Sequence, residues 1–127
     1  MKNFFLEVIS MMNFKNIYRG DVFLVDCGKV VGSEQGGIRP AVVIQNDTGN
    51  RHSPTTIVAL ITSKPKKNLP THVLIHKLVK PSYVLLEQIR TVSIERIGQY
   101  ICTLDSSDMK KIDEALKRSF AITAFTA

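Results

Sequence analysis

Short apolar runs that end at turn-forming residues constrain the fold of this chain more than any other feature. The runs are rich in valine, isoleucine and threonine and are separated by glycine, proline, asparagine and serine, which is the pattern of strands in a compact β domain. They cover residues 22–26, 41–45, 56–62, 72–75, 84–91 and 99–104. Six strands of this kind predict a mainly β domain that closes into a barrel.

The third and second of these runs carry more detailed signals. Residues 57–61 are apolar without interruption, which is typical of a strand whose two faces are both buried. A partner subunit could bury one of these faces. Pro40 holds Arg39 in an extended conformation, so we expect the second strand to begin there. The glycine-rich segment 28–38 before it is too long for a tight hairpin and predicts a mobile loop.

The last part of the chain predicts an amphipathic helix. Asp105 offers a side-chain oxygen for the N-cap, and the apolar residues that follow it recur at helical spacing. They are Met109, Ile112, Leu116 and Phe120. We expect this stripe to pack on the sheet. The opposite face carries Lys110, Lys111, Glu114, Lys117 and Arg118. Such a mixture of charges is typical of a solvated surface.

The net charge of the chain bears on its binding partner, and the position of the first strand signals bears on its domain boundary. The formal net charge is +6, and most of the excess lies within residues 17–104. This excess favours a polyanion such as nucleic acid, although a solvated surface that aids solubility explains it as well. Residues 1–16 precede the turn and strand signals, so we expect an N-terminal extension outside the core and one domain over residues 17–127. Met1, Met11 and Met12 are alternative native starts.

Several classes of protein are excluded by the sequence. No apolar run approaches the roughly 20 residues of a membrane span, so we expect no membrane partner. Glu7 interrupts the apolar start and no small-residue cleavage site follows, which argues against export. Cys27 and Cys102 are far apart and form no C-x-x-C pair, so they predict free thiols in a reducing cytoplasm and no zinc site.

Motifs for phosphate loops and metals are also missing. The glycine-rich segment 28–38 lacks the P-loop spacing and precedes a strand, not a helix. His52 falls in a predicted loop, and His72 and His76 fall on one face of the fourth strand, but no cluster of Cys, Asp or Glu accompanies any of them. We therefore predict no metal site and no cofactor, while an acid/base role for a histidine stays open.

Five sequence blocks, in order, carry a resemblance to a known family. They are R-G-D-V at 19–22, G-S-E-Q-G-G-I-R-P-A-V-V-I-Q-N-D at 32–47, G-N-R-H-S-P-T-T-I-V-A at 49–59 followed by I-T at 61–62, L-P-T-H-V at 69–73, and L-L-E-Q-I-R-T at 85–91. Together they resemble the MazF/PemK family of toxin endoribonucleases over about residues 17–122.

The resemblance implies a fold and an activity. The implied fold is an SH3-like barrel of the MazF/CcdB type, with a C-terminal helix, that forms a homodimer. The implied activity is metal-independent, sequence-specific cleavage of single-stranded mRNA in the cytoplasm, at UACAU sites in the most similar subgroup. The implied partner is a small MazE-like antitoxin that neutralises the toxin of such a type II toxin-antitoxin system.

Two residues match the catalytic positions of that family, Arg39 and Thr62. When a ribose 2′-OH attacks its own phosphate, negative charge grows on the non-bridging oxygens, and a guanidinium and a hydroxyl both donate hydrogen bonds to that charge. Arginine stays protonated, so Arg39 suits charge stabilisation and proton delivery to the leaving 5′ oxygen better than general-base catalysis. The alternative is structural, with Arg39 bound to an acid and Thr62 to a backbone carbonyl.

Other polar residues are candidates for binding RNA. Glu34 and Gln35 in the glycine-rich segment offer hydrogen-bonding groups to base edges, as do Glu87 and Gln88 on the fifth strand. Strand alternation sends Glu87 and Gln88 to opposite faces, so we expect one of them at the RNA surface and favour Gln88.

Basic residues follow Thr62 closely in the sequence. Lys64, with Lys66 and Lys67, is placed to bind RNA phosphates, although a solvated turn explains these residues equally well. His52 stands where the family often has an aromatic residue, which leaves its role open between base stacking, loop packing and proton exchange.

Two other functions compete with the nuclease. One is a non-catalytic toxin or inhibitor on the same barrel that binds a protein target, as the gyrase-poisoning relatives do. The other is a plain nucleic-acid-binding barrel, which the net charge suggests but the absence of tryptophan disfavours. The G-G-I-R-P and I-T blocks favour the endoribonuclease.

Overall fold

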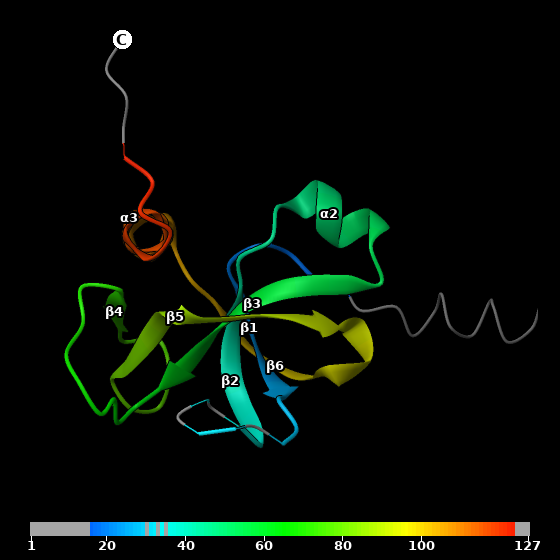
Figure 1. Cartoon of the computed structure of the whole chain (residues 1–127). Helices are drawn as coiled ribbons and strands as arrows, with labels where there is room; N and C mark the ends of the chain where they lie inside the picture. The colour runs from blue at the N-terminus through cyan, green and yellow to red at the C-terminus, as the bar shows by residue number, and fades with distance from the viewer. Residues whose placement is uncertain (1–15, 30, 33, 35, 124–127) are drawn as a thin grey trace, which may run out of the picture.

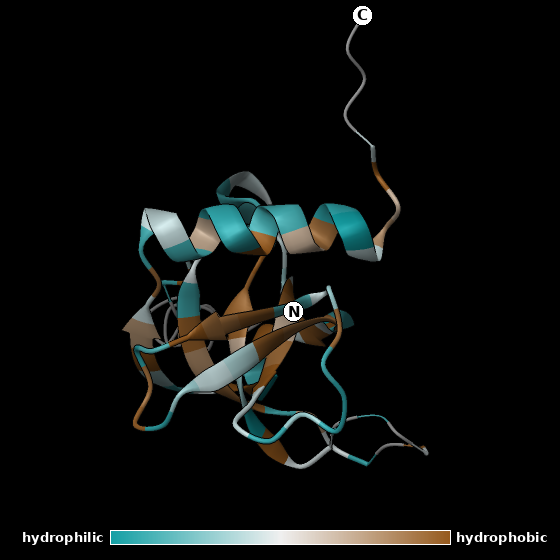
Figure 2. Cartoon of the chain, turned by 90° about the vertical axis from the view of Figure 1, so that its left-hand side faces the viewer, coloured by the Kyte–Doolittle hydropathy of each residue, from teal (hydrophilic) through white to brown (hydrophobic). Residues whose placement is uncertain are grey.

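An antiparallel sheet and a C-terminal helix make up the fold (Figures 1 and 2). The computed structural model describes residues 16–29, 31, 32, 34 and 36–123. Within them the strands are β1 (Asp21–Asp26), β2 (Ile38–Val43), β3 (Thr55–Thr62), β4 (His72–Ile75), β5 (Ser82–Ser93) and β6 (Ile97–Thr103), and the sheet order is β4-β5-β3-β2-β1-β6. A 3-10 turn, η1 (Ile94–Arg96), joins β5 to β6. The six predicted strands and the mainly β fold class are confirmed. The expected extension lies almost wholly outside the described residues.

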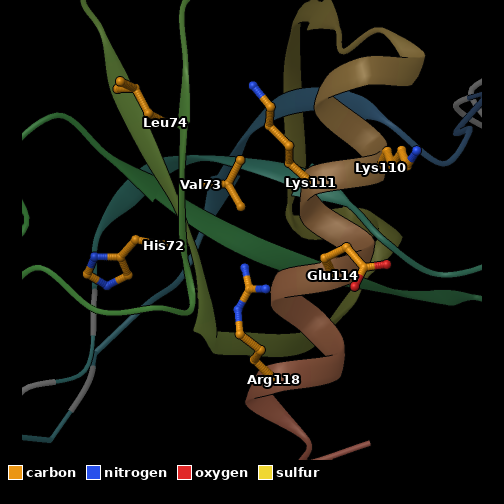
Figure 3. A pocket seen from close by; sticks show the side chains of 7 residues that line it. All are labelled: His72, Val73, Leu74, Lys110, Lys111, Glu114 and Arg118. Carbon is orange, nitrogen blue, oxygen red and sulfur yellow. The ribbon is translucent and has the colours of Figure 1, made fainter. Parts of the chain in front are cut away.

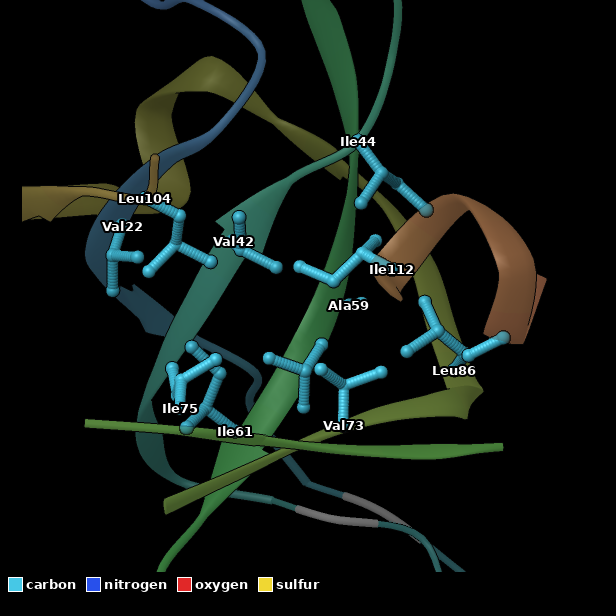
Figure 4. Close-up of a cluster of buried hydrophobic side chains, with 12 residues drawn as sticks. Val22, Val42, Ile44, Ala59, Ile61, Val73, Ile75, Leu86, Leu104 and Ile112 are labelled. Carbon is cyan, nitrogen blue, oxygen red and sulfur yellow. The ribbon is translucent and has the colours of Figure 1, made fainter. Parts of the chain in front are cut away.

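The sheet buries apolar side chains on both faces, because successive side chains of a strand point to opposite sides. On β3, Ala59 and Ile61 belong to the cluster under the helix, whereas Val58 and Leu60 belong to a second cluster on the other face. Figure 4 shows the first cluster, in which strand residues meet Ile112 of the helix. All of these side chains are buried within the chain itself, so the two covers of β3 need no partner subunit.

A change of register bends β5 in its middle. Ala59 of β3 pairs with Ile89 of β5, but its neighbour Leu60 pairs with Leu85. Residues 86–88 therefore have no opposite residue on β3, and such an insertion bends and twists a strand. The half of β5 before the bend also pairs with β4, and the half after it runs toward β6.

The predicted helix is α3 (Ser106–Ser119), which lies across one face of the sheet (Figure 2). The Asp105 carboxylate accepts a hydrogen bond from the Asp108 amide at 2.8 Å, as expected of the N-cap. Ile112 is fully buried, and Met109 and Leu116 pack against the same cluster. Phe120 is 58% exposed, so its predicted packing is wrong. The reason is that α3 ends at Ser119 and Phe120 is its C-cap. Among the described residues, none of the helices has the length and apolar composition of a membrane span.

A short helix, α2 (Asp47–His52), occupies a segment that the sequence predicted as a loop. The Asn46 side chain caps it by accepting a hydrogen bond from the Gly49 amide at 2.8 Å. Asn50 is buried, and its side-chain oxygen accepts hydrogen bonds from Thr56 Oγ1 at 2.6 Å and Gln45 Nε2 at 3.1 Å. These bonds tie α2 to the start of β3. His52 is therefore the last residue of a helix and not part of a loop.

Candidate functional site

Arg39 and Thr62 line one pocket of about 300 Å³. Arg39 lies near the start of β2, and Thr62 is the last residue of β3. The two strands pair from Val43 opposite Val58 to Ala41 opposite Leu60, and the same register continued by two residues puts Arg39 across from Thr62. Facing residues of neighbouring strands are about 5 Å apart at their Cβ atoms, so the register brings the two side chains together.

Backbone contacts orient both side chains. Arg39 Nε donates a hydrogen bond to the Gly36 carbonyl at 3.0 Å. Thr62 Oγ1 accepts a hydrogen bond from the Lys64 amide at 3.2 Å. Because Oγ1 is the acceptor in that bond, the hydroxyl hydrogen of Thr62 remains available to a ligand in the pocket.

Glycines shape the loop that leads to Arg39. The Gly37 amide donates to the Gly28 carbonyl at 3.0 Å, and the Cys27 amide donates to the Gly37 carbonyl at 2.8 Å, so the loop is closed at its base. Gly37 has a φ of 70°, a conformation that side chains rarely adopt. This turn precedes the extended Arg39 and presents the Gly36 carbonyl to its guanidinium.

The charge of this pocket is positive. Its charged lining residues are Arg39 and Lys80, and the described residues that line it include no carboxylate. Among the described residues, Arg39 also forms no ion pair with an acid. Two cations and a free hydroxyl around one hollow are donors suited to a phosphate group.

A second pocket, of about 270 Å³, brings together residues of the L-P-T-H-V and L-L-E-Q blocks. Glu87 and Gln88 both line it, together with Lys66 and Lys67. The prediction that strand alternation separates Glu87 from Gln88 is therefore wrong. The physical reason is the register change of β5, which leaves residues 86–88 without partners on β3 and ends the regular alternation there.

The Glu87 carboxylate is held by two side chains. His72 Nε2 lies 2.8 Å from Oε2, and Thr71 Oγ1 donates to Oε1 at 2.8 Å. The Leu69 amide donates to His72 Nδ1 at 3.4 Å, which leaves the ring proton on Nε2, facing Glu87. Burial acts to raise the pKa of Glu87, but the hydrogen bond to His72, a backbone hydrogen bond and the hydrogen bond from Thr71 together outweigh it, and the net pKa is lowered. Glu87 is thus a fixed, ionised acceptor.

The other predicted RNA-binding residues lie elsewhere. The Glu34 side chain accepts a hydrogen bond from the Val31 amide at 3.2 Å, and Glu34 lines neither pocket. Lys64 is exposed and contributes its backbone amide to Thr62, but it too lines neither pocket. Gln35 lies outside the described residues.

Lys80 also lines the pocket of Arg39 and Thr62, although no sequence motif marks it. It precedes β5 by two positions, and Tyr83 of β5 pairs with Thr62. To place Lys80 near Thr62 from the sequence, one must know that the third and fifth strands pair. Hydrophobic patterns do not specify which strands pair, so the sequence does not predict this position of Lys80.

The charged face of α3 borders a third hollow, of about 440 Å³, beside β4. Figure 3 shows Lys111 and Arg118 reaching from α3 toward β4, whereas Lys110 and Glu114 point away. Arg118 Nε donates to the Pro70 carbonyl at 2.9 Å, so this side chain joins the helix to the loop before β4. Lys117 forms an exposed ion pair with Glu114 at 3.3 Å.

The histidines are spread over the molecule. His52 is exposed at the end of α2, His72 contacts Glu87, and His76 is exposed just after β4. In the part of the chain that the structure describes, no group of three or more His, Cys, Asp or Glu side chains is arranged to hold a metal ion.

The sequence of this chain is similar to one family of toxins and to an endoribonuclease. The family model for PemK-like, MazF-like toxins of type II toxin-antitoxin systems matches residues 18–120. Endoribonuclease EndoA of Bacillus subtilis (strain 168) is 52% identical over 114 residues, which cover 86% of this chain and 98% of EndoA.

Solved structures show the same fold. A mycobacterial endoribonuclease in complex with its cognate antitoxin has a TM-score of 0.72 at 24% identity, covering 84% of this chain and 97% of its own. MazF of Deinococcus radiodurans has a TM-score of 0.71 at 22% identity, covering 82% of this chain and 96% of its own.

Proposed function

Since this chain belongs to the family of PemK-like, MazF-like toxins of type II toxin-antitoxin systems, we propose that it is an endoribonuclease whose Arg39 and Thr62 bind the scissile phosphate. The observation that carries the proposal is the pocket that these two side chains share on neighbouring strands. The 52% identity to a protein named as an endoribonuclease supports the same activity.

The proposed reaction needs no group beyond the RNA and these side chains to stabilise charge. The 2′-OH of one ribose loses its proton to water as its oxygen attacks the adjacent phosphorus, the bond from phosphorus to O5′ of the next nucleotide breaks, and the products are a 2′,3′-cyclic phosphate and a 5′-hydroxyl. Arg39 offers paired donors to the non-bridging oxygens and passes a proton to the leaving O5′, which it regains from water so that the guanidinium stays charged, while the Thr62 hydroxyl donates to the same phosphate.

The second pocket is suited to reading bases. Gln88 offers both a donor and an acceptor, and the ionised Glu87 offers acceptors at a fixed position. Lys64, Lys66 and Lys67 would lie along the backbone of a strand that passes from the first pocket to the second. We propose that these residues, with Glu34 and Gln35 of the glycine-rich loop, restrict cleavage to single-stranded mRNA at UACAU sites.

The proposal extends to partners and organisation. A mycobacterial relative was solved with its cognate antitoxin, and we propose that a MazE-like antitoxin neutralises this chain as well. We further propose that the active form is a cytoplasmic homodimer, that residues 17–127 form the nuclease domain, and that residues 1–16 are not needed for cleavage.

The test of the nuclease is cleavage in excess EDTA. Purified protein is expected to cut an unstructured RNA that contains UACAU, and to leave 5′-hydroxyl and cyclic or 3′-phosphate ends that polynucleotide kinase assays identify. An RNA that stays intact until magnesium is added would contradict the proposal. So would an RNA that stays intact under all conditions while the protein inhibits gyrase, because the non-catalytic alternative predicts that result.

A further inference from the structure

The turn between β4 and β5 carries a second cation into the pocket of Arg39 and Thr62. We propose that Lys80 binds the RNA phosphate next to the scissile one and so positions the substrate on Arg39, an inference that rests on the proposed function. Lys80 lines this pocket, and β3 runs between β2 and β5 in the sheet. Thr62, at the end of β3, therefore has Arg39 on its β2 side and Lys80 on its β5 side. A strand of RNA that crosses Thr62 meets one cation and then the other.

The backbone of Lys80 is held on both sides. Leu78, two residues before it, packs against the cluster under α3. Ser82, two residues after it, is buried and pairs with Ile75, and its hydroxyl donates to the Lys80 carbonyl at 2.9 Å. The chain between these anchors turns outward, which leaves Val79 and Lys80 exposed. Because the backbone of Lys80 is already fixed, binding of RNA to its ammonium group costs less conformational entropy than binding to a mobile loop would.

The charge of Lys80 is not neutralised by the fold. Lys77 belongs to the same turn, but its ammonium lies 3.6 Å from the Asp105 carboxylate. For Lys80, no carboxylate of the described residues lies within ion-pair distance, and the other charged residue of its pocket is Arg39. Two unneutralised cations that line one pocket repel each other, and a polyanion that binds both relieves that repulsion.

This role predicts a particular change in binding. Each phosphate contact on a single strand contributes about 0.7 to the slope of log K against log salt concentration. Lys80→Ala is expected to weaken the binding of RNA roughly 5- to 10-fold and to make the slope shallower by about 0.7. Lys80→Arg keeps the charge and is expected to keep both values near those of the wild type. Lys77→Ala is the matched control, because it removes a lysine from the same turn that already has a partner.

The experiment uses the full chain and two RNAs. An oligonucleotide with a single 2′-deoxy residue 5′ to the cut gives the dissociation constant at several KCl concentrations, and the all-ribose RNA gives kcat and KM. We expect Lys80→Ala to raise the dissociation constant and KM while kcat stays within about 2-fold. The inference is overturned if Lys80→Ala keeps the wild-type salt slope and affinity, or if kcat falls and the affinity does not. If the wild-type protein leaves the all-ribose RNA uncut, the proposed function itself has failed.

Discussion

Replacing Arg39 with alanine is expected to slow RNA cleavage by at least about 100-fold, the usual cost of one preorganised donor to transition-state charge. The guanidinium is held by the Gly36 carbonyl and faces a pocket with no carboxylate among its described lining residues. Arg39 is half-buried near the start of β2 and belongs to neither apolar cluster, so its side chain does not form the core. The variant should therefore fold. Single-turnover cleavage at saturating enzyme concentration measures the loss without a contribution from binding.

Two other arginine variants make this result specific. Arg39→Lys keeps the charge but loses the planar pair of donors, so we expect an activity between those of the wild type and the alanine variant. Arg51→Ala removes an exposed guanidinium from α2 and is expected to leave the rate unchanged. Equal rates for Arg39→Ala and Arg51→Ala, with both proteins folded by circular dichroism, would remove Arg39 from the mechanism.

Replacing Thr62 with valine is expected to slow cleavage by about 100-fold, because it removes the hydroxyl and keeps the shape of the side chain. Thr62 Oγ1 accepts a hydrogen bond from the Lys64 amide, which lies in an exposed turn where water replaces the lost acceptor. The cost in stability should be small. Thr62→Ser restores the hydroxyl and is the matched control. A valine variant as active as the serine variant would show that this hydroxyl does not contact the reacting phosphate.

The losses of cleavage rate caused by Arg39→Ala and by Thr62→Val should not be additive in free energy. If Arg39 and Thr62 bind one phosphate, removing either already misplaces it, so the double variant is expected to be little slower than Arg39→Ala. Losses that multiply fully would indicate separate sites of action. The same single-turnover assay measures all the variants.

The strands could be predicted because their signals are local. Turn residues separate runs of β-branched residues. The ring of Pro40 restricts the residue before it to an extended conformation, which marks the start of the second strand. The core helix α3 has an N-cap and a regular apolar stripe over Met109, Ile112 and Leu116. The stripe continues in the sequence to Phe120, but the helix ends before it, and the position of a helix end is weakly specified by periodicity.

The missed features depend on contacts between distant residues. Helix α2 has no apolar stripe, and the hydrogen bonds of buried Asn50 to Gln45 and Thr56 hold it in place. The approach of Glu87 and Gln88 to one pocket depends on a register change in β5 that the sequence does not mark with glycine or proline. Lys80 reaches the candidate site through strand pairing, and no motif contains it.

Cleavage of an RNA with one 2′-deoxy residue at the nucleotide 5′ to the cut tests the central claim most directly. If the 2′ oxygen of that nucleotide is the nucleophile and Arg39 and Thr62 stabilise the charge it creates, the deoxy RNA binds as tightly as the all-ribose RNA and stays intact in excess EDTA. The all-ribose RNA is cut at that site under the same conditions. Cleavage of the deoxy RNA at the same bond, with a 3′-hydroxyl and a 5′-phosphate as products, would contradict the account.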